Sequence, residues 1–209
     1  MSEPRFPPLP PELGERLDRE SYKRDFRERD AEVVRHDSWK LERLQHFEEQ
    51  GSASRDALRR GAWDEALALL GERRDTLLAL AREDERRGSF FHRVRVVEKP
   101  LTPYLQWELH SLRQRAAYGE RVRVVDAGTL AEAEAPGPLP EVVVLGGRTL
   151  YRVLYSASGA TLGAIRYTEP ELVGRWERAV AELYGSAEDM ARYFDREVAH
   201  LPPPKPPTE

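Results

Sequence analysis

Hydrophobic and polar residues alternate in two stretches that flank a helical repeat near the middle of the chain. Valines recur at alternate positions in residues 93–97 and again in residues 121–126, which is the spacing of β-strands. Between them, residues 102–119 begin with Thr-Pro, repeat leucines at helical spacing and end in glycine, as a capped helix does. Parallel strands need such a crossover connection, so residues 89–126 are predicted to form a right-handed β-α-β unit.

Three further apolar segments follow, separated by glycine-containing turns. Gly146-Gly147 and Ser158-Gly159 are pairs typical of tight turns between hairpin strands. The segments cover residues 141–145, 148–155 and 161–167. They predict an antiparallel meander that joins the β-α-β strands in one mixed sheet. The predicted fold class is therefore α+β, with helices covering the sheet.

The first part of the chain is predicted to be mostly helical. Residues 13–37 are densely charged with a narrow apolar stripe, which fits a solvated helix or a loosely ordered segment. Residues 38–47 alternate and are expected to form a strand. Residues 54–88 carry leucines at helical spacing, with Gly61 and Gly71 as expected interruptions, and their apolar face is interpreted as core.

Two helices are predicted to finish the domain. Thr168 and Glu171 have the spacing of a capping box, so we expect a helix to begin there. Ser186 and Asp189 repeat that spacing ahead of the last helix.

Proline-rich segments mark both ends of the chain. Residues 1–12 and 201–209 are expected to be disordered tails that folding does not need, and residues 13–200 a single mixed α/β domain with an N-terminal helical layer. Residues 5–11 match the R-x-x-P-x-x-P pattern of polyproline ligands. Because so short a pattern often arises by chance, we interpret the segment as a plain tail.

The charge balance and amino-acid content argue against several classes of function. The 209 residues carry a formal net charge of −4, which argues against direct nucleic-acid binding. The chain has no cysteine, which excludes disulfides, thiolate catalysis and cysteine-based zinc sites. No apolar run reaches the length of a transmembrane helix and no hydrophobic signal core begins the chain, so a cytoplasmic location is expected.

Complete catalytic and cofactor-binding signatures are missing from the sequence. The five histidines are scattered and form no H-E-x-x-H pair, so no metal site is predicted. There is no G-x-S-x-G elbow and no Walker loop. Residues 97–102 lack the glycines that let a backbone approach a pyrophosphate, so no cofactor is expected there.

One cluster of polar and aromatic side chains lies at or beyond the carboxyl end of the first β-α-β strand, where open α/β sheets bind ligands beside a helix N-terminus. The candidate binding residues, to which no catalytic role is assigned, are Lys99, Tyr104, Trp107, Glu108, His110 and Arg113. Helical spacing puts Tyr104, Trp107 and Glu108 on one side of the helix, where the group can bind an anion or perform acid–base chemistry. The alternative is that Trp107 covers the sheet while Glu108 and Arg113 pair with neighbours.

Three sequence runs carry a resemblance to a known family. They are RVRVVEKPLTPYLQWELHSLRQRAAYGERVRVVD, PLPEVVVLGGRTLYRVLY and YFDREVAHLPPP. Over about residues 38–204 the chain looks like an actinobacterial family of domains of unknown function. That resemblance implies a single-domain cytoplasmic protein of a kind often found near helix-turn-helix regulators, and it brings no catalytic residues with it.

The order strand, helix, strand, hairpin is also similar to half of a phospholipase D-like domain. That superfamily's catalytic signature is H-x-K followed four residues later by Asp. Here His92 precedes Arg93 and Val94, and none of the five histidines has lysine two positions on. This more remote resemblance therefore implies a non-catalytic member used for binding.

These observations favour a non-catalytic accessory or interaction protein that works with a helix-turn-helix transcription regulator. The alternative is a small-molecule-binding module or an enzyme that uses a pocket near Tyr104, Trp107 and Glu108. A degenerate phosphodiesterase-like domain is a further alternative. The sequence leaves the oligomeric state and the ligand open.

Overall fold

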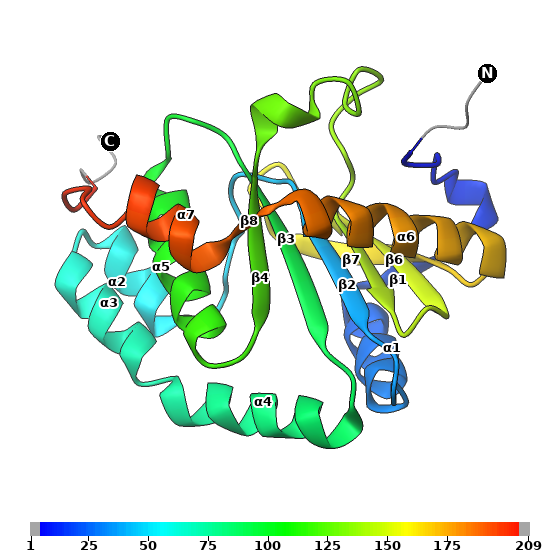
Figure 1. The fold of residues 1–209 in the computed structure, drawn as a ribbon, viewed down its shortest axis with the longest axis horizontal. Helices are drawn as coiled ribbons and strands as arrows, with labels where there is room; N and C mark the ends of the chain where they lie inside the picture. The colour runs from blue at the N-terminus through cyan, green and yellow to red at the C-terminus, as the bar shows by residue number, and fades with distance from the viewer. Residues whose placement is uncertain (1–4, 205–209) are drawn as a thin grey trace.

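The β-α-β unit predicted from the alternating valines lies at the centre of the computed structural model, which describes residues 5–204 (Figure 1). Strands β3 and β4 run parallel, with Val94 opposite Arg123. Helix α5 connects them and begins as predicted, because the Thr102 hydroxyl accepts a hydrogen bond of 3.1 Å from the N–H of Leu105. The bounds of the unit are β3 (Phe91–Val97), α5 (Pro103–Ala117) and β4 (Arg121–Asp126).

Within the described residues, the β-α-β unit and the antiparallel meander belong to one mixed sheet of eight strands. Strand β2 (Ser38–Glu42) lies between them. This strand runs parallel to β3 and antiparallel to β5, so it links the β-α-β unit to the antiparallel meander. The strand order is β1-β7-β6-β5-β2-β3-β4-β8. The remaining strands are β1 (Glu15–Asp18), β5 (Val142–Leu145), β6 (Thr149–Tyr155), β7 (Thr161–Tyr167) and β8 (Glu188–Asp189). The predicted α+β class is confirmed.

Helices cover the two faces of the sheet unequally (Figure 1). Helix α6 (Pro170–Ser186) lies across one face, where its Trp176 packs with Leu41 and Val94 in the largest apolar cluster. On the opposite face, α5 packs with α7 (Met190–Glu197) over β4, while α1 (Arg19–Ala31) lies over β7. On that opposite face, the central strands β2 and β3 lie between α1 on one side and the pair α5 and α7 on the other.

The central strands carry charged side chains on the face between α1 and α5. Lys40 and Glu42 alternate with apolar residues on β2, and Arg93 and Arg95 do the same on β3. Glu42 pairs with Lys40 at 2.6 Å and also with Arg93, and Arg95 pairs with Glu108 of α5 at 2.8 Å. Buried strands usually carry apolar residues on both faces, so these pairs mark an unusual centre for the sheet.

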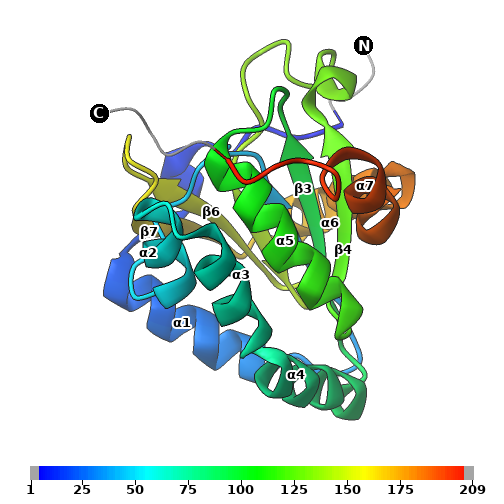
Figure 2. The same ribbon diagram turned by 90° about the vertical axis from the view of Figure 1, so that its left-hand side faces the viewer.

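The predicted helical stretch 54–88 forms three helices beside α5 and below the sheet (Figure 2). Gly61 separates the first two with a positive φ of 75°, and Gly88 ends the third with a φ of 60°. The bounds are α2 (Ala53–Arg59), α3 (Trp63–Gly71) and α4 (Arg74–Arg87). Both predicted interruptions therefore fall at or next to helix ends.

Two predicted boundaries are wrong in detail. The strand predicted over residues 38–47 ends at Glu42, because the carboxylate of Glu141 accepts from the N–H groups of Arg43 and Leu44 at 2.5 Å each and diverts the chain from the sheet. Strand β1, which pairs antiparallel with β7, lies inside a segment predicted to be helical or loosely ordered.

The predicted capping boxes are also replaced by neighbouring residues. Pro170 occupies the first helical position of α6, so the cap falls on Glu169, whose side chain accepts from the N–H groups of Glu171 and Leu172. At α7 the cap is Asp189 alone, because Ser186 is the last residue of α6.

Parts of the predicted tails pack on the domain. Leu9 is buried, and its carbonyl oxygen accepts from the Tyr167 hydroxyl at 3.1 Å. The Phe6 ring lies 5.5 Å from that of Trp176. At the other end, the Pro202 carbonyl accepts from the side chain of Gln106 at 2.8 Å. Apolar contacts and backbone carbonyl hydrogen bonds thus hold the described residues of both proline-rich segments against the domain. Residues 1–4 and 205–209 lie outside the described part of the chain.

Short 3₁₀ turns complete the chain at η1 (Pro11–Leu13) and η2 (Ala127–Leu130). None of the helices within residues 5–204 is long and apolar enough to cross a membrane.

Candidate functional site

A cavity of about 350 Å³ lies where β2 and β3 end, beside the first turn of α5. The loop after β2, the start of α3, helix α2 and the start of α5 contribute its walls. Its lining residues include His46, Arg55, Arg59, Trp63, Thr102 and Tyr104. The cavity therefore occupies the edge of the sheet at which open α/β folds bind ligands. We call it the Arg55 cavity.

Arg55 is the buried cation of this cavity. Only 8% of the residue is exposed. It lies in the first turn of α2, where the Ser52 hydroxyl caps the helix by accepting a hydrogen bond of 3.2 Å from the N–H of Arg55. Its guanidinium carbon lies 5.1 Å from the ring centroid of Tyr104 and 5.9 Å from that of Trp107. Both aromatic faces therefore attract the cation.

Arg55 forms no ion pair within the part of the chain that the structure describes, although the carboxylates of Glu48 and Glu49 lie close enough to raise its pKa. Its Nε is buried and lacks a hydrogen-bond partner, and no carboxylate oxygen lies within 4 Å of the guanidinium. Burial and the nearby charge of Arg59 lower the pKa of Arg55 below its ordinary value. A buried cation without a direct ion-pair partner favours an anion as its ligand.

Tyr104 and His46 form a second wall of the cavity. Their rings lie 4.7 Å apart, and the Tyr104 hydroxyl is 3.2 Å from a carboxylate oxygen of both Glu49 and Glu108. Burial raises the pKa of Tyr104, so the hydroxyl remains protonated and acts as a donor. Burial and the charge of Arg55 lower the pKa of His46, which is therefore neutral at pH 7.

Trp107 and Glu108 lie behind the cavity wall and hold it together. The Trp107 indole N–H donates to the Ser54 hydroxyl at 2.8 Å, which fixes α5 against α2. Glu108 pairs with the fully buried Arg95 at 2.8 Å, which fixes α5 against β3. Burial raises the pKa of Glu108 while the charge of Arg95 opposes that shift. Trp107 packs with the α2–α3 cluster rather than covering the sheet as the alternative interpretation expected.

The other three candidate residues lie outside the cavity lining. Lys99 pairs with Glu197 at 2.9 Å and with Asp126 at 3.7 Å. Arg113 is half-buried in the second half of α5. The structure thus brings Tyr104, Trp107 and Glu108 together and leaves Lys99, His110 and Arg113 apart from them.

His110 supports the cavity from outside. Its ring packs edge-on against Trp63, 5.2 Å away, and against Phe194 at 4.8 Å. Burial lowers its pKa, so the ring behaves as a neutral aromatic spacer between α3 and α7.

Sequence reasoning missed the residues that give the cavity its chemistry. Arg55 and Trp63 lie in a stretch interpreted as core, and His46 lies in a segment predicted to be a strand. The available signal is weak: an arginine stands among Ser54, Ala57 and Leu58, all of which the structure buries. Charge inside an apolar stripe indicates either an ion pair or a site, and the sequence does not distinguish the two.

The geometry suits binding of a planar anion. The cavity provides a guanidinium, two aromatic rings and a neutral imidazole, and its volume is at the lower end of the range for small-molecule sites. Within residues 5–204 no three His, Asp or Glu side chains are grouped so that they could hold a metal ion.

Comparison with curated proteins gives no match. Comparison with family models gives a match to a domain of unknown function, DUF6879, over residues 24–195. These residues include the whole β-α-β unit and the meander. They also include His46, Arg55, Arg59, Trp63, Thr102 and Tyr104 of the Arg55 cavity. Because that match spans most of the chain, the protein belongs to the DUF6879 family.

Proposed function

We propose that the protein is a non-catalytic accessory protein that binds a small planar anion in the Arg55 cavity and works with a helix-turn-helix regulator in the cytoplasm. The observation that carries the binding part is the buried guanidinium of Arg55, which forms no ion pair and whose Nε has no hydrogen-bond partner, in the wall of an aromatic cavity. The regulator and the location rest on the family resemblance drawn from the sequence.

The ligand class follows from the chemistry of the wall. A guanidinium binds carboxylate and phosphate groups through paired N–H donors. The rings of Trp63 and Tyr104 provide apolar surface for a flat ligand body. A small aromatic carboxylate or phosphate monoester satisfies both features at once.

Binding is favoured over catalysis because the acidic and phenolic groups near the cavity already serve the fold. Glu108 is engaged by Arg95, and the raised pKa of Tyr104 keeps its hydroxyl protonated at neutral pH. Because Glu108 is held by Arg95 and the Tyr104 hydroxyl stays protonated, neither group is free to take up a proton from a substrate. The same groups, held rigid, suit a preorganised binding site.

Thermal-shift and calorimetric titrations test the ligand class. Benzoate, salicylate and phenyl phosphate are the anionic probes, and benzamide and benzyl alcohol are neutral controls of similar shape. We expect the anions to raise the melting temperature and the neutral molecules to leave it unchanged. Equal binding of benzamide would show that the charge of Arg55 is not used and would refute the proposal.

Two substitutions locate the effect. Arg55→Met keeps an unbranched apolar stem and removes the charged guanidinium, so we expect it to abolish anion binding. Arg60→Met removes an exposed arginine five residues further along the chain, paired with Glu65 at 3.0 Å, and should leave binding intact. If Arg55→Met still binds the anions, their binding site lies outside the Arg55 cavity.

Co-purification from the native host under low-salt conditions tests the partner. Recovery of a helix-turn-helix protein, with an amount that changes when the anion is added, supports the regulator link. Its repeated absence under conditions that preserve weak complexes would remove that link and leave the ligand proposal unaffected.

A further inference from the structure

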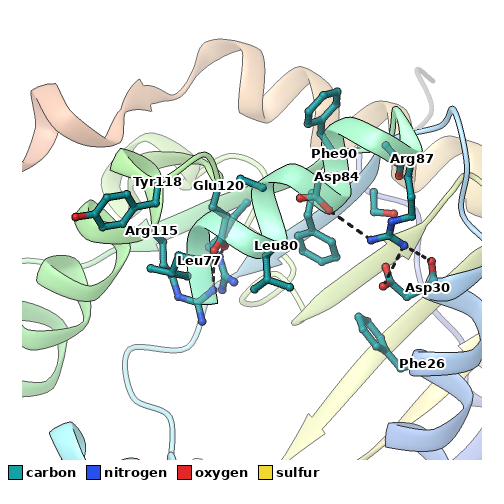
Figure 3. A pocket seen from close by; sticks show the side chains of 15 residues that line it. Phe26, Asp30, Leu77, Leu80, Asp84, Arg87, Phe90, Arg115, Tyr118 and Glu120 are labelled. Atoms are coloured by element: carbon teal, nitrogen blue, oxygen red, sulfur yellow. Dashed lines mark hydrogen bonds and ion pairs between the residues drawn. The ribbon is translucent and has the colours of Figure 1, made fainter. Parts of the chain in front are cut away.

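A groove runs between α1 and α4 across the centre of the sheet, on the face opposite α6. It consists of two adjoining cavities of about 340 and 410 Å³, whose walls share Phe26, Phe91 and Arg93. The floor comes from β2 and β3. The sides come from α1, which carries Phe26, and from α4, which carries Leu80 (Figure 3). We call it the α1–α4 groove.

The groove exists because, within residues 5–204, no helix lies directly over the central strands on the face opposite α6. Helix α1 packs on β7, α5 packs on β4, and α4 lies beyond the ends of β2 and β3 (Figures 1 and 2). The strands left between them expose Lys40, Phe91 and Arg93 to the opening. Sheet centres in α/β folds are ordinarily covered, so this surface is suited to an added element.

One side of the groove is apolar and open to solvent. Both Leu77 and Leu80 come from α4, where Leu77 is buried and Leu80 is 55% exposed. Phe26 of α1 lies on the other side of the same opening (Figure 3). A large exposed leucine beside a partly buried phenylalanine is typical of a surface that contacts another protein.

The charges inside the groove are already neutralised. Arg87 lies 3.3 Å from Asp84 and 3.6 Å from Asp30, and Glu120 accepts from Arg93 at 2.8 Å and from Arg115 at 2.6 Å. Figure 3 shows the Arg87 pairs at one end of the groove. These groups shape the walls and leave little net charge there.

The rim of the groove on α1 carries charges that are not neutralised by ion pairs. Lys23 and Arg27 line the groove and are exposed, and neither lies within 4 Å of a carboxylate in the described part of the chain. The unneutralised charge at the groove is therefore positive, on a chain whose formal net charge is −4. A partner that complements it carries acidic groups.

We infer that the α1–α4 groove binds an acidic amphipathic peptide segment of a partner protein. Apolar side chains of the segment contact Phe26 and Leu80, and its carboxylates contact Lys23 and Arg27. An amphipathic helix laid into an apolar groove is a recurring mode of peptide recognition. The inference rests on the part of the proposed function that gives the protein a partner, and it needs no ligand in the Arg55 cavity.

A peptide-display selection against the full chain tests the inference. A library of random 16-residue peptides is selected on the immobilised protein, and the enriched peptides are titrated by fluorescence anisotropy. We expect enrichment of Asp and Glu with apolar residues three and four positions apart. Enrichment of basic peptides, or of peptides without helical spacing, would overturn the inference.

Variants identify where the peptides bind. We expect Leu80→Asp, and separately the double variant Lys23→Glu/Arg27→Glu, to weaken binding at least tenfold. Leu162→Asp changes a leucine of matched exposure, 53%, on β7 and should have no effect. All three sites are exposed, so the variants are expected to fold, which circular dichroism checks. Peptides that bind Leu80→Asp as well as the original chain would overturn the inference.

Two further measurements distinguish peptide binding in the α1–α4 groove from anion binding in the Arg55 cavity and from nucleic-acid binding. Arg55→Met should bind the peptides normally, so a failure of the peptide selection leaves the ligand proposal standing, and the reverse also holds. A random-sequence DNA duplex is tested in parallel. DNA binding that is lost in the Lys23/Arg27 variant and kept in Leu80→Asp would identify a nucleic-acid surface and overturn the peptide assignment.

Discussion

Arg55 lies with its guanidinium carbon 5.1 Å from the ring centroid of Tyr104, and this contact joins α2 to the first turn of α5. The pair combines a buried cation with a buried aromatic donor at the end of the sheet where ligands bind in related architectures. Stability alone explains the aromatic ring, but it does not explain a guanidinium whose Nε is left without a partner.

Arg55→Met is expected to raise stability while it removes anion binding. An unpaired buried cation destabilises the fold, and groups kept for binding often carry such a cost. We expect a gain of about 0.5–2 kcal/mol in the free energy of unfolding, measured by urea denaturation without ligand. A loss of stability would mean that the aromatic stacking of Arg55 outweighs its desolvation.

Glu108 is expected to act in stability and not in ligand binding. Glu108→Ala leaves the fully buried Arg95 without its partner, which should cost about 3–5 kcal/mol. The double variant Arg95→Met/Glu108→Met should recover most of that loss, because it leaves no charge unpaired. Anion affinity in the double variant should stay within threefold of the original. If the double variant regained stability but lost anion affinity, Glu108 would have a role in ligand binding.

Local patterns in the sequence are enough to predict the β-α-β unit, the meander and the Thr102 cap. Each of these depends on residues close together in the chain, such as the Thr-Pro pair or the Gly146-Gly147 turn. The position of β2 between the two parts of the sheet is not predictable in this way, because its pairing with β3 and β5 joins distant segments.

The candidate site shows the same division. Helical spacing correctly places Tyr104 and Glu108 on one side of α5. The spacing carries no information on Arg55, which reaches them only because α2 folds back beside α5. His46 is hidden for a related reason: the strand predicted through it ends at Glu42, where Glu141 captures two backbone N–H groups.

Leu9→Ala is expected to destabilise the protein although the residue lies in a proline-rich segment. Its side chain is buried against the α6 side of the sheet, so truncation leaves a cavity and should cost about 2 kcal/mol or more. Leu13→Ala, at a leucine that is 67% exposed, is the matched control and should be nearly neutral. Thermal unfolding of the two variants makes the comparison. Equal stability of both would restore the interpretation of a dispensable tail.

Glu141 is expected to make stability fall as pH rises towards 7. Burial raises the pKa of Glu141 to about 7 from an ordinary value of 4.5, so the folded state binds more protons than the unfolded state between these values. The loss across that window should be about 1–3 kcal/mol. Glu141→Gln cannot ionise and should flatten this part of the profile, measured by urea unfolding from pH 4.5 to 8. An unchanged slope would assign the effect to other groups.

His46 is expected to couple anion binding to proton uptake. Burial and the charge of Arg55 lower its pKa below 6.5 in the free protein, so protonation opposes folding as the pH falls. An anion beside Arg55 offsets that positive charge and raises the pKa of His46, and affinity should therefore increase as the pH falls below neutrality. Calorimetry at pH 6 in two buffers of different ionisation enthalpy measures the uptake directly. His46→Phe keeps the aromatic contact with Tyr104 and should abolish the uptake, whereas His36→Phe, at an exposed histidine bonded to Glu177, should preserve it. Uptake that persists in His46→Phe would place the titrating group elsewhere, on the ligand or on another side chain.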